Sequence, residues 1–252
     1  MSRMKILVLD IETSPNLAWV WGLWNQNIGL SQLVQPTFVM SWAAKWVGQK
    51  TVHYKKHTDA EFLDKIWELM NEADAIVHYN GRKFDIPHLN REFLEAGMTP
   101  PSNFFEIDLL TTVRSRFRFP SNKLAYVAEQ LLNAGKLPTG GFGLWTAALE
   151  GKAWAWAKMR KYNIQDVIVT DDLYNLLKGW IKNHPNHGLY VEDQENPICR
   201  NCGSEKVKEN GNEYDTTGVF AYKRYRCNDC GANLRGRDSV KGKKSESLQV
   251  VK

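Results

Sequence analysis

The chain has 252 residues, of which 43% are hydrophobic and 24% are charged, a composition typical of one substantial globular domain with room for a small module. The N-terminal residues lead into a short apolar run broken by Asp10 and Glu12, which predicts neither a signal peptide nor a membrane span and favours a cytoplasmic protein. The net charge of +5 falls on residues 199–252, with 12 Lys and Arg against 7 Asp and Glu. This asymmetry favours an appendage that meets a polyanion, and a solvated surface is the alternative.

Apolar runs and helical periodicity divide most of the chain into alternating elements. Ile6 to Leu9 is a continuous aliphatic run, typical of a strand covered on both faces. Thr58 and Glu61 match a capping box, which predicts a helix continuing through Met70. Four of the nine residues at 135–143 are glycine, which predicts a mobile loop. Further strands are expected at 37–46, 51–54, 75–79 and 104–109, and helices at 87–97, 110–116, 123–133 and 152–181.

The order of these elements predicts an α/β domain with a mixed central sheet and helices on its faces. The first strands are expected to form an antiparallel meander. A polar linker at 193–197 follows the last long helix, so we place a domain boundary near residue 195. The predicted organisation is a main domain at 1–195, a cysteine module at 196–240 and a basic, disordered tail at 241–252.

Three short stretches place carboxylates where one cation site could gather them. Asp10 and Glu12 are two apart at the end of a strand, so they project to the same side. Asp85 follows a second buried strand after a turn that contains glycine. Tyr162 and Asp166 are four apart on a helix and therefore share a face. Individually these residues are equally well explained as a solvated strand end, a helix cap and a packed tyrosine.

Four acids in apolar contexts require a compensating charge, because clustered carboxylates cannot all ionise unaided. Two divalent cations would supply it, with the oxygen-rich coordination that Mg²⁺ or Mn²⁺ prefers. Such a pair of ions can clamp the attacking and leaving oxygens of a phosphodiester. The constellation therefore predicts phosphoryl-transfer hydrolysis.

The same residues carry a family resemblance. Asp10-Ile11-Glu12-Thr13, Asn80 with Phe84-Asp85-Ile86-Pro87, and Tyr162 with Asp166 resemble, in order, the three motifs of 3'-to-5' exonucleases with a ribonuclease H-like fold. The resemblance spans about residues 5–180 and is closest to the proofreading domains of family B DNA polymerases. Within that family the chain resembles the tyrosine subclass, because the histidine subclass would have His at position 161, where this chain has Lys161.

The resemblance implies a role for each matching position. Asp10, Glu12 and Asp166 would ligate the more tightly held of two Mg²⁺ or Mn²⁺ ions, Asp10 would bridge to the second, and Asp85 would assist through water. Tyr162 would orient the attacking water, since a phenol with a pKa of ~10 is a poor base at neutral pH. The remaining motif residues are candidates for substrate binding: Thr13, Asn80 and Phe84.

All four cysteines lie in the C-terminal region, as two pairs that are each followed by glycine: Cys199 and Cys202, then Cys227 and Cys230. With strand-like residues at 219–225 between them, the pairs predict a zinc ribbon with one structural Zn²⁺. A rubredoxin-like iron site uses similar pairs and is the alternative. A module of about 40 residues cannot bury enough core alone, so the metal would hold its fold together.

Basic and aromatic residues surround the cysteine pairs and favour nucleic-acid contact. A purely structural ribbon, or one that docks a protein, would show the same composition. Tryptophans are most often core residues, and the cluster Trp19, Trp21 and Trp24 just after the first strand is the one that merits a test of base stacking. The basic and aromatic set comprises Phe220, Tyr222, Lys223, Arg224, Tyr225, Arg226, Arg235, Arg237, Lys241, Lys243 and Lys244.

The leading hypothesis is a stand-alone, metal-dependent 3'-to-5' exonuclease acting on single-stranded DNA, with RNA as the alternative substrate. A separate polymerase, or another replication or repair protein, is a candidate partner, because the chain holds no polymerase motifs. Two alternatives stay open: a structure-selective or RNA-directed nuclease on the same fold, and a nucleic-acid-binding adaptor without turnover. The complete set of acids and the tyrosine argues against the adaptor.

Overall fold

The computed structural model describes residues 4–134, 141–191, 196–217 and 220–244. The chain forms two compact units, one at Lys5–Asn175 and one that comprises Leu176–Lys252 together with Met1–Met4. The boundary near residue 195 stays a prediction, and in the structure the segment from residue 176 to 191 belongs to the unit that carries the cysteines. Among the described residues, no helix is both long and apolar enough to cross a membrane.

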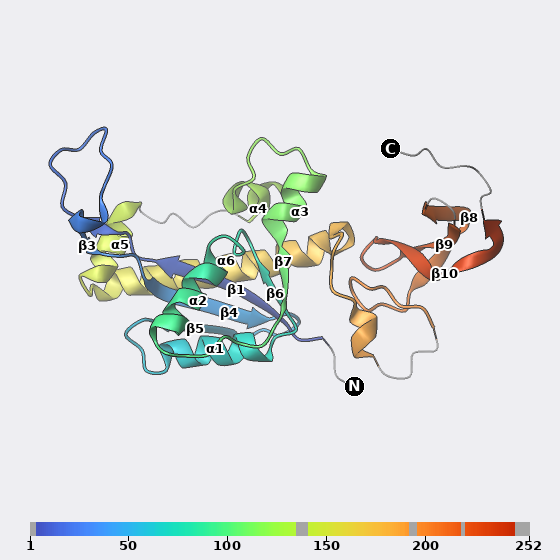
Figure 1. Cartoon of the computed structure of the whole chain (residues 1–252), viewed down its shortest axis with the longest axis horizontal. Helices are drawn as coiled ribbons and strands as arrows, with labels where there is room; N and C mark the ends of the chain where they lie inside the picture. Colours follow the sequence, from blue (N-terminus) through green and yellow to red (C-terminus); the bar gives the residue numbers. More distant parts are fainter. Residues whose placement is uncertain (1–3, 135–140, 192–195, 218–219, 245–252) are drawn as a thin grey trace. The chain divides into compact units, whose positions relative to one another are not determined.

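The larger unit is built on a five-stranded sheet in the order β5-β4-β1-β6-β7 (Figure 1). Strand β1 pairs antiparallel with β4 and parallel with β6, and β4 pairs antiparallel with β5. The mixed sheet and the antiparallel meander at its start confirm the predicted α/β architecture. The strands are β1 Ile6–Thr13, β4 Val39–Trp46, β5 Val52–Lys56, β6 Ala75–His78 and β7 Phe105–Asp108.

Helices cover both faces of this sheet (Figure 1). On one face, α1 (Phe62–Glu72) and α2 (Asp85–Glu95) pack on Leu7, Leu9 and Ile11 of β1. Side chains alternate along a strand, so Asp10 and Glu12 face the other side. There α6 (Ala153–Leu177) crosses the sheet. Two further helices, α3 (Leu109–Arg116) and α4 (Leu124–Leu132), follow β7.

Two local predictions differ from the structure. The capping box at Thr58 does not form: α1 begins at Phe62, and Glu61 before it has φ 55° and no side-chain cap. The reason is that the Asp59 carboxylate accepts a hydrogen bond from the Lys56 backbone N–H (3.0 Å), which closes a turn after β5. The second difference is at the predicted loop 135–143, where Phe142 and Gly143 belong to α5 (Phe142–Leu149), with Gly141 directly before it. Residues 135–140 lie outside the described ranges.

A short two-stranded ribbon is inserted between β1 and β4. It consists of β2 (Leu17–Ala18), the 3₁₀ helix η1 (Leu30–Gln32) and β3 (Leu33–Gln35), with the tryptophan-rich residues between β2 and η1. Most large apolar side chains of that segment are exposed. It therefore adds little to the core and projects from the larger unit (Figure 1).

The smaller unit contains the end of α6, two 3₁₀ helices and a three-stranded antiparallel sheet in the order β10-β9-β8. Its core is small, with Cys199, Cys227 and Ala232 as the buried members. Strand β9 confirms the strand predicted at 219–225, apart from residue 219, which lies outside the described ranges. Strand β10 overlaps the predicted tail at 241–244. These elements are η2 Lys178–Trp180, η3 His187–Tyr190, β8 Val207–Thr217, β9 Phe220–Cys227 and β10 Asn233–Lys244.

Candidate functional site

Three carboxylates from two distant parts of the chain meet on the α6 face of the sheet. Asp10, Glu12 and Asp166 each offer an oxygen atom within 4.8 Å of the others. The first two share a face of β1 because they are two residues apart, and Asp166 is brought to them by α6. The donor set is the oxygen-only set that a hard divalent cation prefers.

The electrostatics of this cluster favour a bound cation. Burial raises the pKa of Asp10 well above its usual range, and the negative charges of Asp85, Glu12 and Asp166 raise it further. A hydrogen bond from the Asn163 side chain lowers it. A divalent cation among these oxygens would neutralise their charge and bring the Asp10 pKa down again.

Asp85 lies beside the three carboxylates but its oxygens are not in the group within 4.8 Å. It is buried at the start of α2, and one of its oxygens accepts a hydrogen bond from the Ile11 backbone N–H (3.0 Å). Burial raises the pKa of Asp85 to about 6, an effect that His78 and the Ile11 N–H partly offset. Asp85 thus connects the start of α2 to the strand that carries Asp10 and Glu12.

Tyr162 faces the carboxylates from one turn earlier on α6. Burial raises the pKa of its phenol above the usual value of 10.0, and the negative charges of Asp166 and Glu12, with a hydrogen bond to Asp166, raise it further. The hydroxyl therefore keeps its proton at neutral pH. A protonated phenol can donate a hydrogen bond and orient a water molecule, but it cannot take a proton from that water.

Asn163 is a site residue that sequence reasoning missed. Its side chain is fully buried, and its Nδ2 donates to the Asp10 carboxylate (2.6 Å) and to the Asp10 backbone carbonyl (3.2 Å). The Ser41 hydroxyl donates to the Asn163 carbonyl oxygen (3.2 Å) and fixes the orientation of the amide. The position next to Tyr162 was the available signal, but its partner is 153 residues away in sequence.

We expect Asn163→Ala to raise the Mn²⁺ concentration needed for half-maximal activity by about tenfold or more. Metal ligands that lose such a supporting hydrogen bond lose metal affinity on this scale. The measurement is initial rate against Mn²⁺ concentration. Asn175→Ala is the matched control: Asn175 also lies on α6 and donates to an aspartate, but that aspartate, Asp171, pairs with Lys45. Equal effects of the two substitutions would contradict a role for Asn163 at the site.

The turn between β6 and α2 is held by a second group of hydrogen bonds. Asn80 has φ 74° and donates its backbone N–H to Asp108 (3.0 Å), which also caps α3. The Gly81 N–H donates to Nδ1 of the buried His78 (3.0 Å), whose Nε2 contacts Glu106 (3.3 Å). A Cβ at Gly81 would lie 2.5 Å from the His78 ring, so glycine is required there.

The predicted substrate-binding residues lie at the edge of this site. Phe84 directly precedes α2, is 38% exposed and contacts the His88 ring (centroids 4.5 Å apart). Thr13 ends β1 at a register irregularity opposite Val39. Together with Asn80, these residues come from the same strand ends as Asp10 and Asp85.

The four cysteines form a second candidate metal centre in the smaller unit. Their sulfur atoms all lie within 4.8 Å of one another, and the closest pairs are Cys199 with Cys230 (3.5 Å) and Cys202 with Cys227 (3.6 Å). All four are free thiols. Tetrahedral zinc with Zn–S bonds of about 2.3 Å would place the sulfurs about 3.8 Å apart, so the donors fit zinc.

The two cysteine turns have matching backbone geometry. In the first, Cys199 N–H donates to the Ser204 carbonyl (2.8 Å) and Gly203 N–H to the Cys199 carbonyl (2.8 Å). In the second, the corresponding bonds join Cys227 to Ala232 (3.0 Å) and Gly231 to Cys227 (3.0 Å). Gly203 and Gly231 have φ of 72° and 73°, which explains the glycine after each pair.

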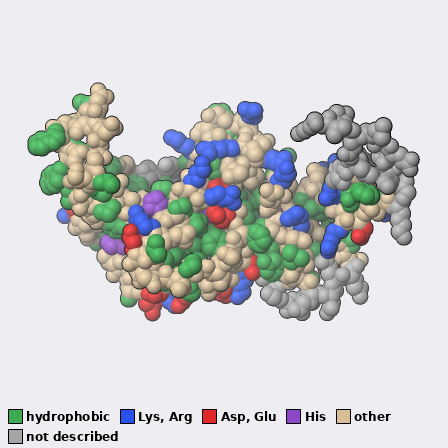
Figure 2. Space-filling view, viewed as in Figure 1, with side chains coloured by type: hydrophobic (Ala, Val, Ile, Leu, Met, Phe, Trp, Pro, Cys, Tyr) green, Lys and Arg blue, Asp and Glu red, His purple; other side chains and the backbone are tan. Residues whose placement is uncertain are grey.

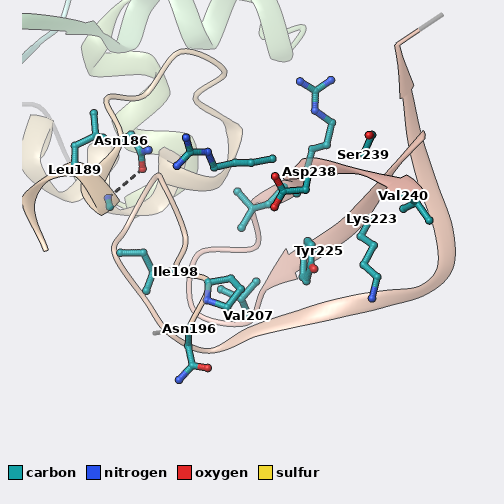
Figure 3. A pocket seen from close by; sticks show the side chains of 16 residues that line it. Asn186, Leu189, Asn196, Ile198, Val207, Lys223, Tyr225, Asp238, Ser239 and Val240 are labelled. Carbon is teal, nitrogen blue, oxygen red and sulfur yellow. Dashed lines mark hydrogen bonds between the residues drawn. The ribbon is translucent and has the colours of Figure 1, made fainter. Parts of the chain in front are cut away.

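The smaller unit also contains a basic cavity of about 680 Å³. Side chains near η3, such as Asn186 and Leu189, line one side, and Lys223 and Tyr225 of β9 line the other (Figure 3). Arg235 and Arg237 of β10 add positive charge. The Arg235 guanidinium stacks on the Tyr222 ring at 4.6 Å. Cationic and aromatic groups thus occur together beside the cysteine centre.

Comparison with known proteins agrees with this fold and site. A family model described as the RNase H superfamily matches residues 7–178, and the chain belongs to this superfamily. Among solved structures, it is similar to the family B DNA polymerase from the hyperthermophilic archaeon Pyrobaculum calidifontis, with a TM-score of 0.52 and 17% identity. The match covers 69% of this chain and 25% of the polymerase chain. No curated protein sequence matches.

These findings confirm the predicted ribonuclease H-like fold with a mixed central sheet. Two clusters of residues fit metal binding: the acidic triad fits a divalent cation, and the four cysteines fit zinc. Triad and fold together support a nuclease that acts as a hydrolase and binds nucleic acid.

Proposed function

We propose that the chain is a 3'-to-5' exonuclease that removes nucleotides from the 3' end of single-stranded DNA. The observation that supports it best is the carboxylate triad with Tyr162 hydrogen-bonded to Asp166. The order and spacing of the three motifs match proofreading exonucleases of the tyrosine subclass, and the similar solved structure is a DNA polymerase. Both favour a DNA substrate over RNA.

In this proposal Asp10, Glu12 and Asp166, with Asp85 beside them, would hold two Mg²⁺ or Mn²⁺ ions, and the chemistry supplied by those ions would be activation of water and stabilisation of the departing 3' oxygen. Tyr162 orients the attacking water with its protonated hydroxyl. Asn163 keeps the Asp10 carboxylate in place. One Asp85 oxygen accepts from the Ile11 N–H, and Asp85 would assist the site through water.

The terminal nucleotide would lie against Thr13, Asn80 and Phe84. Phe84 presents a partly exposed ring at the start of α2, which is suited to stacking on the last base. The Asn80 backbone is held by its N–H, which donates to Asp108 in the turn that leads to Asp85. Stacking does not depend on base identity, as an exonuclease that degrades any sequence requires.

The cysteine module is proposed to be a zinc ribbon at 196–240 that holds the substrate strand. Its basic cavity brings Lys223, Arg235 and Arg237 near Tyr225, so phosphates and bases would both find partners (Figure 3). Lys223 also pairs with Glu209 (3.0 Å), so its contribution depends on exchange of that partner for phosphate. A separate polymerase or repair protein that supplies the 3' end is the proposed protein partner.

The test uses DNA and RNA oligonucleotides, single- and double-stranded, labelled at either end, with Mg²⁺ or Mn²⁺. With single-stranded DNA, we expect 5'-labelled material to shorten one nucleotide at a time and 3'-labelled material to release mononucleotide at once. Internal cuts would contradict an exonuclease, and faster cleavage of RNA would indicate an RNA-directed enzyme. Binding without any metal-dependent cleavage would indicate the adaptor.

A further inference from the structure

The tryptophan-rich insertion between β1 and β4 has an unusual composition. Residues 14–37 contain no charged side chain and no histidine, although they follow directly on the strand with Asp10 and Glu12. We call the part from residue 17 to 35, which comprises β2, η1, β3 and the turn between them, the Trp hairpin.

The indole side chains of the Trp hairpin face solvent. Trp19, Trp21 and Trp24 are 77%, 101% and 84% exposed, and Leu23 and Leu30 beside them are similarly exposed. Exposed apolar groups at the tip of the hairpin are visible at the upper left in Figure 2. Such a concentration of exposed indoles costs free energy in water and marks a binding surface.

The base of the Trp hairpin is fixed to the active-site strand. Ser14, which is buried, accepts from the Thr37 hydroxyl through its carbonyl (2.5 Å) and from the Phe38 N–H through its hydroxyl (3.0 Å). Further out, Trp19 N–H donates to the Gln32 carbonyl (2.9 Å), and the Gln32 amide donates back to the Trp19 carbonyl (3.0 Å). The base of the hairpin and the backbone of Trp19 are therefore fixed to the strand that carries Asp10 and Glu12.

A basic surface lies at the other end of the same unit. Arg114, Arg116 and Arg118 are exposed, and the last two alternate with Phe117 and Phe119, whose ring centroids are 5.8 Å apart. Lys and Arg side chains gather over α3 and the segment that follows it (Figure 2). In Figure 1 this segment and the Trp hairpin project from the same side of the larger unit.

We propose that the Trp hairpin is a binding site for the unpaired bases of a single-stranded nucleic acid. The bases stack on Trp19, Trp21 and Trp24, while the arginines at 114–118 bind phosphates of the same strand. The inference rests on the proposed function, because it assumes a nucleic-acid substrate at the neighbouring carboxylates.

Two observations favour nucleic acid over a protein as the occupant. The hairpin is continuous with β1, which carries two of the three clustered acids. A nucleic acid bound at those acids would therefore lie next to the residues where the hairpin joins β1. The hairpin is uncharged and the arginine surface is positive, and together they match a ligand with neutral aromatic bases and negative phosphates. Stacking on indoles also tolerates any base, as an exonuclease needs.

The test compares binding and catalysis separately. Binding of a fluorescent single-stranded oligonucleotide is measured by anisotropy in an Asp10→Asn background, so that the substrate is not degraded. We expect Trp21→Ala and Trp24→Ala each to raise Kd about tenfold, and the triple variant with Trp19→Ala to raise it further. Trp154→Ala, which removes another exposed tryptophan of the same unit but outside the hairpin, should leave Kd unchanged.

Catalysis is measured with Asp10 intact, on the oligonucleotide and on the p-nitrophenyl ester of thymidine 5'-monophosphate, which has one nucleotide and lacks the further bases proposed to stack on the hairpin. The triple variant should have a higher KM for the oligonucleotide and unchanged kinetics on the ester. Unchanged oligonucleotide binding in the triple variant would overturn the inference. So would a triple variant that differs from the wild type only in self-association, measured by sedimentation. If wild type hydrolyses neither substrate but the triple variant binds more weakly, the exonuclease proposal fails and the hairpin site stands.

Discussion

Asp10→Asn is expected to abolish metal-dependent cleavage while making the metal-free protein more stable. The substitution keeps an oxygen that can accept from Asn163, so the local hydrogen bonds persist. It removes the carboxylate that has all three other acids as neighbours. Loss of several kcal/mol of charge stabilisation in the transition state corresponds to a decrease of about 1000-fold or more in kcat/KM.

The gain in stability follows from the direction of the pKa shifts. The pKa values of Asp10 and Asp85 are raised in the folded protein, so the folded state binds protons more tightly than the unfolded state. The metal-free protein is therefore stabilised at low pH, and this contribution is lost as pH rises from about 4 toward the Asp85 pKa of about 6. At pH 8, relief of the repulsion by Asp10→Asn should make the metal-free protein more stable than the wild type.

Thermal unfolding in EDTA at pH 5 and pH 8 measures this effect, and cleavage of labelled DNA measures the activity. Wild type should lose stability between the two pH values and regain it with Mn²⁺, whereas Asp10→Asn should respond less to both. Asp172→Asn, an exposed aspartate on α6, is the matched control and should behave as wild type. Cleavage by Asp10→Asn at the wild-type rate would place the active centre elsewhere.

The parts of the site that sequence could predict are those set by local geometry. Two residues on one face of a strand, or four apart on a helix, have fixed relations, so the placement of Asp10 with Glu12 and of Tyr162 with Asp166 follows from periodicity. The two cysteine pairs are equally local, because each turn is closed by bonds within six residues. The matching motif order then indicated that these separate elements meet.

The parts that were missed depend on contacts between distant residues. Asn163 is distinguished from an ordinary buried amide by its hydrogen bonds with Asp10 and Ser41. These two residues lie on two strands far from Asn163 in sequence. His78 supports the turn at Gly81 through a contact that periodicity does not encode. The capping box failed for a related reason: Asp59 has a competing turn interaction after β5, and sequence spacing alone cannot rank the two.

Removal of metal from the cysteine module is expected to unfold the β8–β10 sheet and leave the Lys5–Asn175 unit folded. The module's buried core is small, whereas a structural zinc contributes about 10–16 kcal/mol of apparent binding free energy. Cys202→Ser should therefore destabilise the module by more than about 5 kcal/mol. Hydrogen exchange measured by mass spectrometry should show peptides from β9 and β10 losing protection, while peptides from β1 and β6 keep it.

Ser204→Ala is the matched control, because it removes a hydrogen bond to Asp229 (2.8 Å) beside the cysteines but leaves all four thiols. It should retain one zinc per chain by metal analysis, and Cys202→Ser should not. An equimolar amount of iron in the wild type would instead identify a rubredoxin-like centre. The same two variants distinguish a ribbon that binds the nucleic acid from a purely structural one. If the ribbon binds the nucleic acid, Cys202→Ser should raise the KM for oligonucleotides. The rate on the small thymidine ester should be unchanged, because Asp10 and Asp166 belong to the other unit.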